Sequence, residues 1–217
     1  MSHYFETGDG PLITREIEAT VFGRHLTFIT ANTLAAKPPV VLSAGRLVSY
    51  KNFPFLVRAF AHVEPREARL VIIGEGPERE TIVREIERTG QSGRIALAGY
   101  QSDPWPWYAQ ARAFALASES EAFGLVVVEA LAYGLPVVST DCHGPRQILA
   151  DGSFGELVGK GDERGMAAAI TRALAHVGDV PARQKRAVEF SVSVAVARYA
   201  NVIEDVCGPR ASAELAT

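Results

Sequence analysis

The chain has 217 residues, of which 47% are hydrophobic and 22% charged, enough for one well-filled domain of ordinary globular composition. A formal net charge of −3 argues against a dedicated nucleic-acid-binding protein. The sequence has no apolar run of transmembrane length, no signal peptide and only two cysteines, Cys142 and Cys207, without metal-binding spacing, so we expect a cytoplasmic protein and leave peripheral membrane contact open.

Residues 1–39 are expected to form an N-terminal extension. Two β-favouring runs, 17–22 and 25–30, flank Gly23-Arg24 and predict a hairpin. Residues 35–39 contain two prolines and predict a linker into the next segment.

From residue 40 onward, short apolar runs alternate with amphipathic segments. The runs predict strands at 40–44, 70–73, 95–98, 113–117, 136–140 and 156–158. The segments between them predict helices, the first capped by Asn52 and later ones at 124–133, 145–149, 165–175 and 182–206. This alternation predicts an α/β fold, a Rossmann-like doubly wound parallel sheet with C-terminal helices. The expected divisions are a sheet domain over 40–180, a C-terminal helix over 181–207 and a tail over 208–217.

The predicted topology places two loops side by side. In a doubly wound sheet with strand order 3-2-1-4-5, ligands bind beyond the carboxyl ends of the strands, where the order reverses. The loop at 45–52 follows the first strand of this sheet and carries Arg46 and Lys51. The loop at 118–124 follows the fourth strand and carries carboxylates. We therefore expect cations and carboxylates to face each other across one crevice.

Two carboxylates, Glu121 and Glu129, lie eight residues apart around the start of the 124–133 helix. If the whole span is helical, they are roughly 12 Å apart along the axis and can face the same way. Such a pair suits an extended ligand with hydroxyl groups at both ends, such as a nucleotide sugar. The backbone amides of 122–125, at the helix start, would then contact the diphosphate. Glu119 misses the spacing and is interpreted as a solvated loop residue.

The segment E-A-F-G-L-x3-E-A-x3-G-L-P-V-V-S-T-D resembles the E-x7-E signature of retaining glycosyltransferases of the two-domain GT-B type, most closely family 4. The resemblance extends over about residues 40–199. It implies that the chain is the C-terminal, donor-binding half of a GT-B fold. That half would transfer a sugar from a nucleoside diphosphate sugar to an acceptor, with retention and with neither metal nor cofactor.

The resemblance also implies roles for individual residues. Arg46 and Lys51, in a motif that begins at Gly45, would hold the diphosphate and act in catalysis together with Glu121, close to the transferred sugar. Glu129 would accept hydrogen bonds from the ribose hydroxyls. Further donor-binding positions are the base-contacting Tyr100 and the helix-start residues Phe123, Gly124 and Leu125. The turn at 74–77 resembles the family's G-x-G-P turn and is interpreted mainly as architecture.

The other half of such an enzyme would need roughly a hundred or more residues, and 39 precede the predicted sheet. The chain is therefore expected to be a fragment, a split subunit with an acceptor-domain partner chain, or a degenerate relative. The helix at 182–206 would brace the other half. Its apolar side should be exposed, or covered by residues 12–30 or a second chain, and a protease should cut near 180–186 where such a cover is missing.

Other functions remain open. A non-catalytic nucleotide-sugar-binding or regulatory domain would share every donor-site residue. A GT-B phosphorylase or an epimerase ranks lower, because neither a pyridoxal-lysine motif nor the expected carboxylate and histidine pattern is present. Trp105 and Trp107 are expected either to pack a short helix onto the sheet or to form an aromatic lip for an acceptor.

Overall fold

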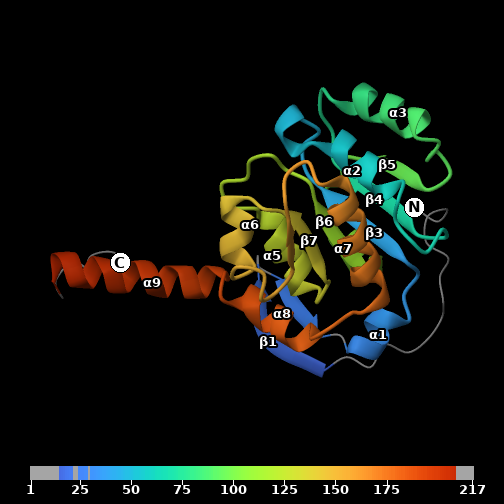
Figure 1. Ribbon diagram of the computed structural model, residues 1–217. Coiled ribbons are helices and arrows are strands. Elements are labelled where there is room, and N and C mark those ends of the chain that lie inside the picture. Colours follow the sequence, from blue (N-terminus) through green and yellow to red (C-terminus); the bar gives the residue numbers. More distant parts are fainter. Residues whose placement is uncertain (1–14, 22–23, 29, 209–217) are drawn as a thin grey trace.

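The computed structural model describes residues 15–21, 24–28 and 30–208, with side chains from residue 30 onward. Within these residues, a six-stranded parallel sheet with the order β5-β4-β3-β6-β7-β8 lies between two layers of helices (Figure 1). The predicted Rossmann-like, doubly wound sheet is therefore confirmed. Its strands are β3 Val40–Ala44, β4 Arg69–Ile73, β5 Ile95–Gly99, β6 Ala113–Leu116, β7 Val137–Thr140 and β8 Glu156–Val158.

Each face of the sheet has its own hydrophobic core, because side chains alternate along a strand. In β3, Val41 packs into one core and Leu42 into the other. The first core is covered by α2 Phe53–Phe60, α3 Arg79–Arg88 and α7 Glu163–Ala175. The second is covered by α4 Trp105–Gln110, α5 Leu125–Ala132, α6 His143–Ile148 and α8 Val180–Val188. Burial on both faces explains why these strands read as continuous apolar runs.

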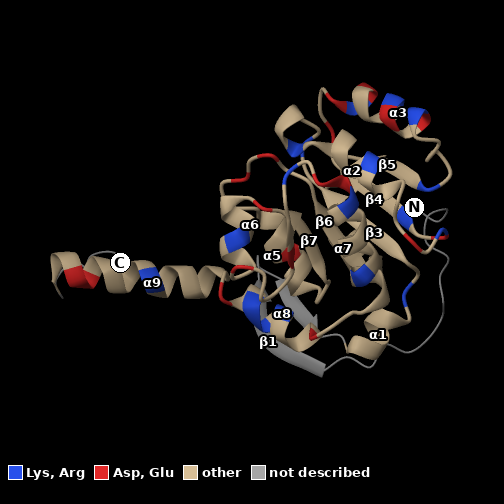
Figure 2. Ribbon diagram, viewed as in Figure 1, with Lys and Arg blue, Asp and Glu red and all other residues tan. Residues whose placement is uncertain are grey.

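Charged side chains of both signs occur within the same helices, as along α3 (Figure 2). Arg58 of α2 bonds Glu85 of α3 at 3.4 Å and Glu163 of α7 at 2.5 Å, which links the three helices of one layer. In the described part of the chain, none of the helices combines the length and hydropathy that a membrane span requires.

The predicted hairpin is present as β1 Arg15–Val21 and β2 Arg24–Phe28, which pair antiparallel in a sheet of their own. Its turn at 22–23 lies outside the described residues. A short helix, α1 Ala31–Ala35, was not predicted. Thr30 caps it by accepting a hydrogen bond from the Thr33 amide at 3.2 Å. The helix ends at Ala35, so the linker to the sheet begins one residue later than expected.

The two tryptophans pack a short helix onto the sheet, so the packing interpretation is confirmed. Trp107 is buried in α4. Trp105 stacks on Tyr133, the residue after α5, with ring centroids 6.1 Å apart. Because Trp107 is buried, it is not available for the alternative, an aromatic lip.

The C-terminal segment forms two helices, not the single predicted helix. α8 ends at Val188, and α9 Val192–Cys207 begins after Ser191, whose hydroxyl caps the Val194 amide at 3.4 Å. α8 is anchored to the body by bonds to backbone carbonyls, from Gln184 to Ala132 at 3.0 Å and from Arg186 to Ile148 at 2.9 Å. It also contacts β1.

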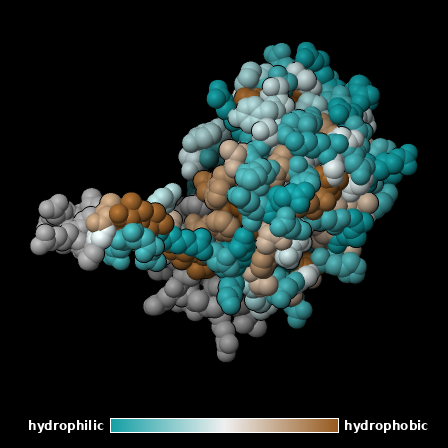
Figure 3. Space-filling view, turned by 60° about the vertical axis from the view of Figure 1, so that its left-hand side comes forward, coloured by the Kyte–Doolittle hydropathy of each residue, from teal (hydrophilic) through white to brown (hydrophobic). Residues whose placement is uncertain are grey.

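α9 projects from the body and has no buried residue (Figure 1). Apolar side chains lie exposed along it (Figure 3), and they are Val192, Val196, Tyr199, Val202 and Val206. An exposed apolar side and a covered one were the two expected outcomes for the C-terminal segment, and each occurs in one half of it. The first half is covered in part by the N-terminal hairpin, and the second half is exposed.

The expected protease site moves accordingly. Trypsin should cut first after Arg198 in α9 and only later after Lys185 in α8, because cleavage needs local unwinding and unwinding α8 exposes buried residues. Mass spectrometry of early digestion products tests this order. Arg198→Gln should remove the early fragment without creating one at Lys185. A first cut at Lys185 would show that α8 opens more easily than its contacts indicate.

Candidate functional site

The strand order reverses between β3 and β6, as predicted. The loop at 45–52 follows β3, and it contains the 3-10 helix Ser49–Lys51. The loop at 117–124 follows β6, the neighbouring strand, so the two loops lie side by side. They are bonded to each other, since the Glu119 amide donates to the Tyr50 carbonyl at 2.8 Å. The Asn52 side-chain amide also donates to the Glu119 carboxylate. Glu119 is thus a bridge between the loops and not only a solvated residue.

A hollow of about 450 Å³ opens beside these loops, at the carboxyl ends of β3, β4 and β5. We call it the central hollow. Its walls also include residues of α4 and α5. Four predicted site residues line it, namely Gly45, Arg46, Tyr100 and Glu129. The other five, Lys51, Glu121, Phe123, Gly124 and Leu125, lie in the adjoining loops and at the start of α5.

Glycines let the strand ends approach closely at the central hollow. Gly74 has a φ of +134°, and a Cβ atom there would lie 1.9 Å from the Gly45 carbonyl oxygen. A Cβ atom at Gly76 would lie 2.3 Å from the carbonyl oxygen of Leu47. The architectural interpretation of the 74–77 turn is therefore confirmed.

Lys51 and Glu121 bind each other, which sequence reasoning did not predict. Their side chains form an ion pair and are only 12% and 15% exposed. The Ser118 hydroxyl donates to the same Glu121 oxygen at 3.4 Å. The stem of Lys51 passes close to Gly45, where a Cβ atom would lie 3.6 Å from Lys51 Cε. In the ligand-free protein, the charges of Lys51 and Glu121, both predicted to contact the ligand, therefore neutralise each other.

Glu129 has a different partner. The buried Tyr108 of α4 donates its hydroxyl to Glu129 Oε2 at 2.6 Å. Burial raises the pKa of Glu129, and the hydrogen bond from Tyr108 opposes that rise. Burial and the neighbouring carboxylate raise the pKa of Tyr108 well above its usual value. Sequence reasoning missed Tyr108, which also lines the central hollow.

The predicted helical geometry of the carboxylate pair is wrong. α5 begins at Leu125, so Glu121 lies in the loop before it, and Gly124 turns the chain with a φ of +98°. The start of α6 fixes this loop, because the Gly144 amide donates to the Glu121 carbonyl at 3.1 Å. A Cβ atom at Gly144 would lie 2.2 Å from the Phe123 carbonyl oxygen. The two carboxylates are therefore held by separate partners and do not share a helix face.

Two predicted contacts are open to a ligand. Tyr100 is 75% exposed at the rim of the central hollow. Arg46 is also exposed, and it makes no ion pair with any residue in the described part of the chain. Across residues 30–208, no three His, Cys, Asp or Glu side chains are grouped as metal ligands would be.

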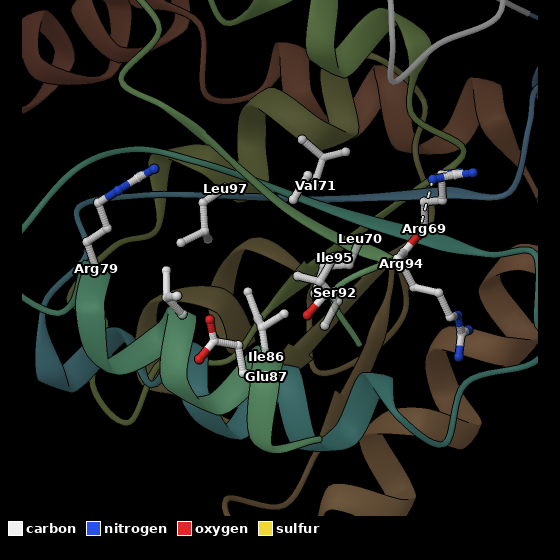
Figure 4. Close-up of a pocket in the computed structure, with 13 residues that line it drawn as sticks. Arg69, Leu70, Val71, Arg79, Ile86, Glu87, Ser92, Arg94, Ile95 and Leu97 are labelled. Atoms are coloured by element: carbon white, nitrogen blue, oxygen red, sulfur yellow. Dashed lines mark hydrogen bonds between the residues drawn. The ribbon is translucent and has the colours of Figure 1, made fainter. Parts of the chain in front are cut away.

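Another hollow, of about 320 Å³, lies between α3 and the edge strand β5 (Figure 4). Ile86 points from the helix toward Ile95 of the strand, and Arg79 and Arg94 lie at opposite ends of the hollow. None of the predicted site residues lines it, and it is at the side of the sheet, away from the order reversal. The candidate site is therefore the central hollow together with the crevice, by which we mean the space beside the two bonded loops at 45–52 and 117–124.

Comparison with known proteins agrees with this fold. A family model for glycosyl transferases group 1 matches residues 27–188. The chain therefore belongs to this glycosyltransferase family.

Among curated relatives, the lipopolysaccharide core biosynthesis glycosyltransferase LpsE of Rhizobium meliloti is 39% identical over 140 residues, which cover 64% of this chain and 41% of LpsE. The N-acetylgalactosamine-N,N'-diacetylbacillosaminyl-diphospho-undecaprenol 4-alpha-N-acetylgalactosaminyltransferase of Campylobacter jejuni is 35% identical, over 61% of this chain and 36% of the relative. The chain thus spans about two fifths of the length of these relatives.

Solved structures of glycosyltransferases show the same fold. The lipopolysaccharide outer core galactosyltransferase WaaB superposes with a TM-score of 0.69 at 28% identity, over 78% of this chain and 50% of WaaB. The pneumococcal O-GlcNAc transferase GtfA, in complex with UDP and GlcNAc, gives 0.68 at 26% identity, over 79% of this chain and 36% of GtfA.

Proposed function

We propose that this chain is the donor-binding half of a glycosyltransferase and binds a nucleoside diphosphate sugar along the crevice and the central hollow. One observation carries the proposal. Beside the order reversal, the central hollow presents an exposed aromatic ring, Tyr100, an exposed cation, Arg46, and a half-buried carboxylate, Glu129. These three groups match a base, a diphosphate and a ribose.

The proposed donor lies with its base against Tyr100 and its ribose hydroxyls on Glu129. Arg46 and Lys51 contact the diphosphate, at about 1.5–3 kcal/mol for each charge-assisted hydrogen bond. The amides of Gly124 and Leu125, at the start of α5, support the same group. Phe123 and Leu125, both exposed, flank the path of the donor.

Donor binding exchanges the partner of Lys51. In the free protein its ammonium binds the Glu121 carboxylate. When the diphosphate arrives, Lys51 turns to it, and Glu121 becomes free to accept hydrogen bonds from the transferred sugar. Two cations then stabilise the charge that develops on the leaving diphosphate, so the proposal needs no divalent metal.

The proposed reaction retains the anomeric configuration. The bond between the anomeric carbon and the diphosphate oxygen breaks, and the acceptor oxygen bonds to that carbon on the same face. The acceptor proton passes to the departing diphosphate. The acceptor is held by a second domain or a partner chain, as the chain's share of its relatives suggests. We place the protein in the cytoplasm, where its two free cysteines stay reduced.

The purified chain should bind a nucleoside diphosphate in the presence of EDTA. At a ligand concentration of 100 Kd, binding should add about 2.7 kcal/mol to the free energy of unfolding and raise the Tm. A thermal-shift panel of UDP, GDP, ADP and their sugars tests this, with Arg46→Gln as the variant expected to bind more weakly. The donor-site assignment fails if none of these ligands raises the Tm at millimolar concentration.

A further inference from the structure

Tyr108 lies in the second core, in contact with the candidate site. Its ring stacks on Phe114 of β6, with centroids 5.8 Å apart, and on Tyr133, the residue after α5, at 5.9 Å. The side chain is fully buried, yet its hydroxyl reaches the central hollow and ends at Glu129 Oε2. One residue thus joins a rigid aromatic stack to a carboxylate at the wall of the hollow.

A carboxylate in this position needs such a partner. Burial disfavours the charged form, and only the charged form accepts hydrogen bonds with all its lone pairs. A hydroxyl donor at 2.6 Å stabilises the charged form and also fixes the rotation of the carboxyl group. Oε2 is bound to Tyr108, so the remaining lone pairs of Glu129 are the ones that can face a ligand.

We propose that Tyr108 is a positioning residue for donor binding, which keeps Glu129 ionised and turned to accept the two ribose hydroxyls. This inference rests on the proposed function, since it assigns Glu129 to the ribose. Tyr108 itself need not touch the donor. Its effect passes through the carboxylate.

Other titratable groups line the central hollow with Glu129, and they are Arg46 from the β3 loop, Glu75 from the β4 loop and Tyr100 from the segment after β5. Tyr133, which follows the last residue of α5, lies about one helical turn beyond Glu129. Among the described residues, Tyr108 is the side chain that hydrogen-bonds to Glu129. Replacing Tyr108 with phenylalanine removes this bond and leaves the aromatic stack in place.

A ligand-free titration tests the coupling between the two residues. The carboxyl carbon of Glu129 is followed by 13C NMR in the wild type and in Tyr108→Phe, and Glu129→Gln identifies the signal. The wild-type hydrogen bond favours the ionised form, so its loss should move the midpoint to higher pH. Tyr199→Phe, which removes an exposed hydroxyl on α9, should leave the midpoint unchanged.

Ligand titrations test whether the coupling serves the ribose. Tyr108→Phe should weaken UDP binding most at acid pH, by about tenfold for each unit by which the midpoint rises. The phosphates of UDP titrate in the same way in both experiments. The ratio of the wild-type affinity to the Tyr108→Phe affinity therefore reports the ionisation of Glu129. Inorganic pyrophosphate, which has no ribose, should bind wild type and Tyr108→Phe equally. In a Glu129→Gln background, Tyr108→Phe should have no further effect.

The outcomes are distinct. An unchanged carboxyl midpoint, or equal losses for UDP and pyrophosphate, would overturn the positioning role and leave the proposed function standing. A wild-type chain that binds none of UDP, GDP and ADP would overturn the proposed function, and the positioning role with it. A raised midpoint together with a loss specific to UDP would establish the role.

Discussion

Replacing Glu129 with alanine should weaken binding of a nucleoside diphosphate and of its sugar by the same factor, roughly ten- to hundredfold. The reason is that both ligands share the ribose. Glu121→Ala should weaken only the nucleotide sugar by such a factor. The bare nucleotide should bind this variant at least as tightly as the wild type, because Lys51 no longer has a carboxylate partner in the free protein.

Isothermal titration of both ligands against the two variants measures these effects. Glu87→Ala is the matched control, since it removes a carboxylate from the hollow between α3 and β5. It should leave both affinities unchanged. Equal losses for both ligands in both carboxylate variants would contradict the separate roles, and a loss in Glu87→Ala would point to the other hollow.

A series of glycine substitutions should separate steric overlap from backbone strain. Gly93→Ala meets no atom within 4 Å and should leave the free energy of unfolding nearly unchanged. Gly76→Ala overlaps the Leu47 carbonyl and should lower it by about 1–3 kcal/mol. Gly74→Ala adds positive-φ strain of about 1–3 kcal/mol to an overlap with the Gly45 carbonyl, so its effect should be the largest.

Urea unfolding measures the free energy of unfolding of the three variants and so ranks their stabilities. Because Gly45 and Gly74 both line the central hollow, Gly74→Ala should also weaken nucleotide binding. Equal stability of all three variants would mean that the strand ends can move apart without loss.

The sheet could be predicted from the sequence because its signals are local. Each strand is a short apolar run, and the alternation of strands with helices indicates a doubly wound sheet, whose usual order reverses between its first and fourth strands, here β3 and β6. The break at 189–191 was missed because it contains neither proline nor glycine. Ser191 was the available signal, as a capping residue in the middle of a helical pattern.

The partners of the site residues could not be predicted, since they depend on tertiary packing. Lys51 and Glu121 are 70 residues apart in the sequence, and Tyr108 and Glu129 are 21 apart. Similarly, the loop before α5 is held by Gly144, whose amide donates to the Glu121 carbonyl and which leaves no room for a Cβ atom beside Phe123. The family motif gives residue types and spacing, and neither contains this contact.

The bonds between the loops at 45–52 and 117–124 have a consequence for the proposed donor site. Glu119 is joined to both Tyr50 and Asn52, and Lys51 is joined to Glu121, so the two loops hold each other in register before any ligand arrives. A ligand then loses little loop entropy on binding. An insertion or deletion in either loop would break this register. Under the proposed function, new donor preferences should therefore arise by side-chain replacement around the rim at Tyr100, and not by insertions or deletions in these two loops.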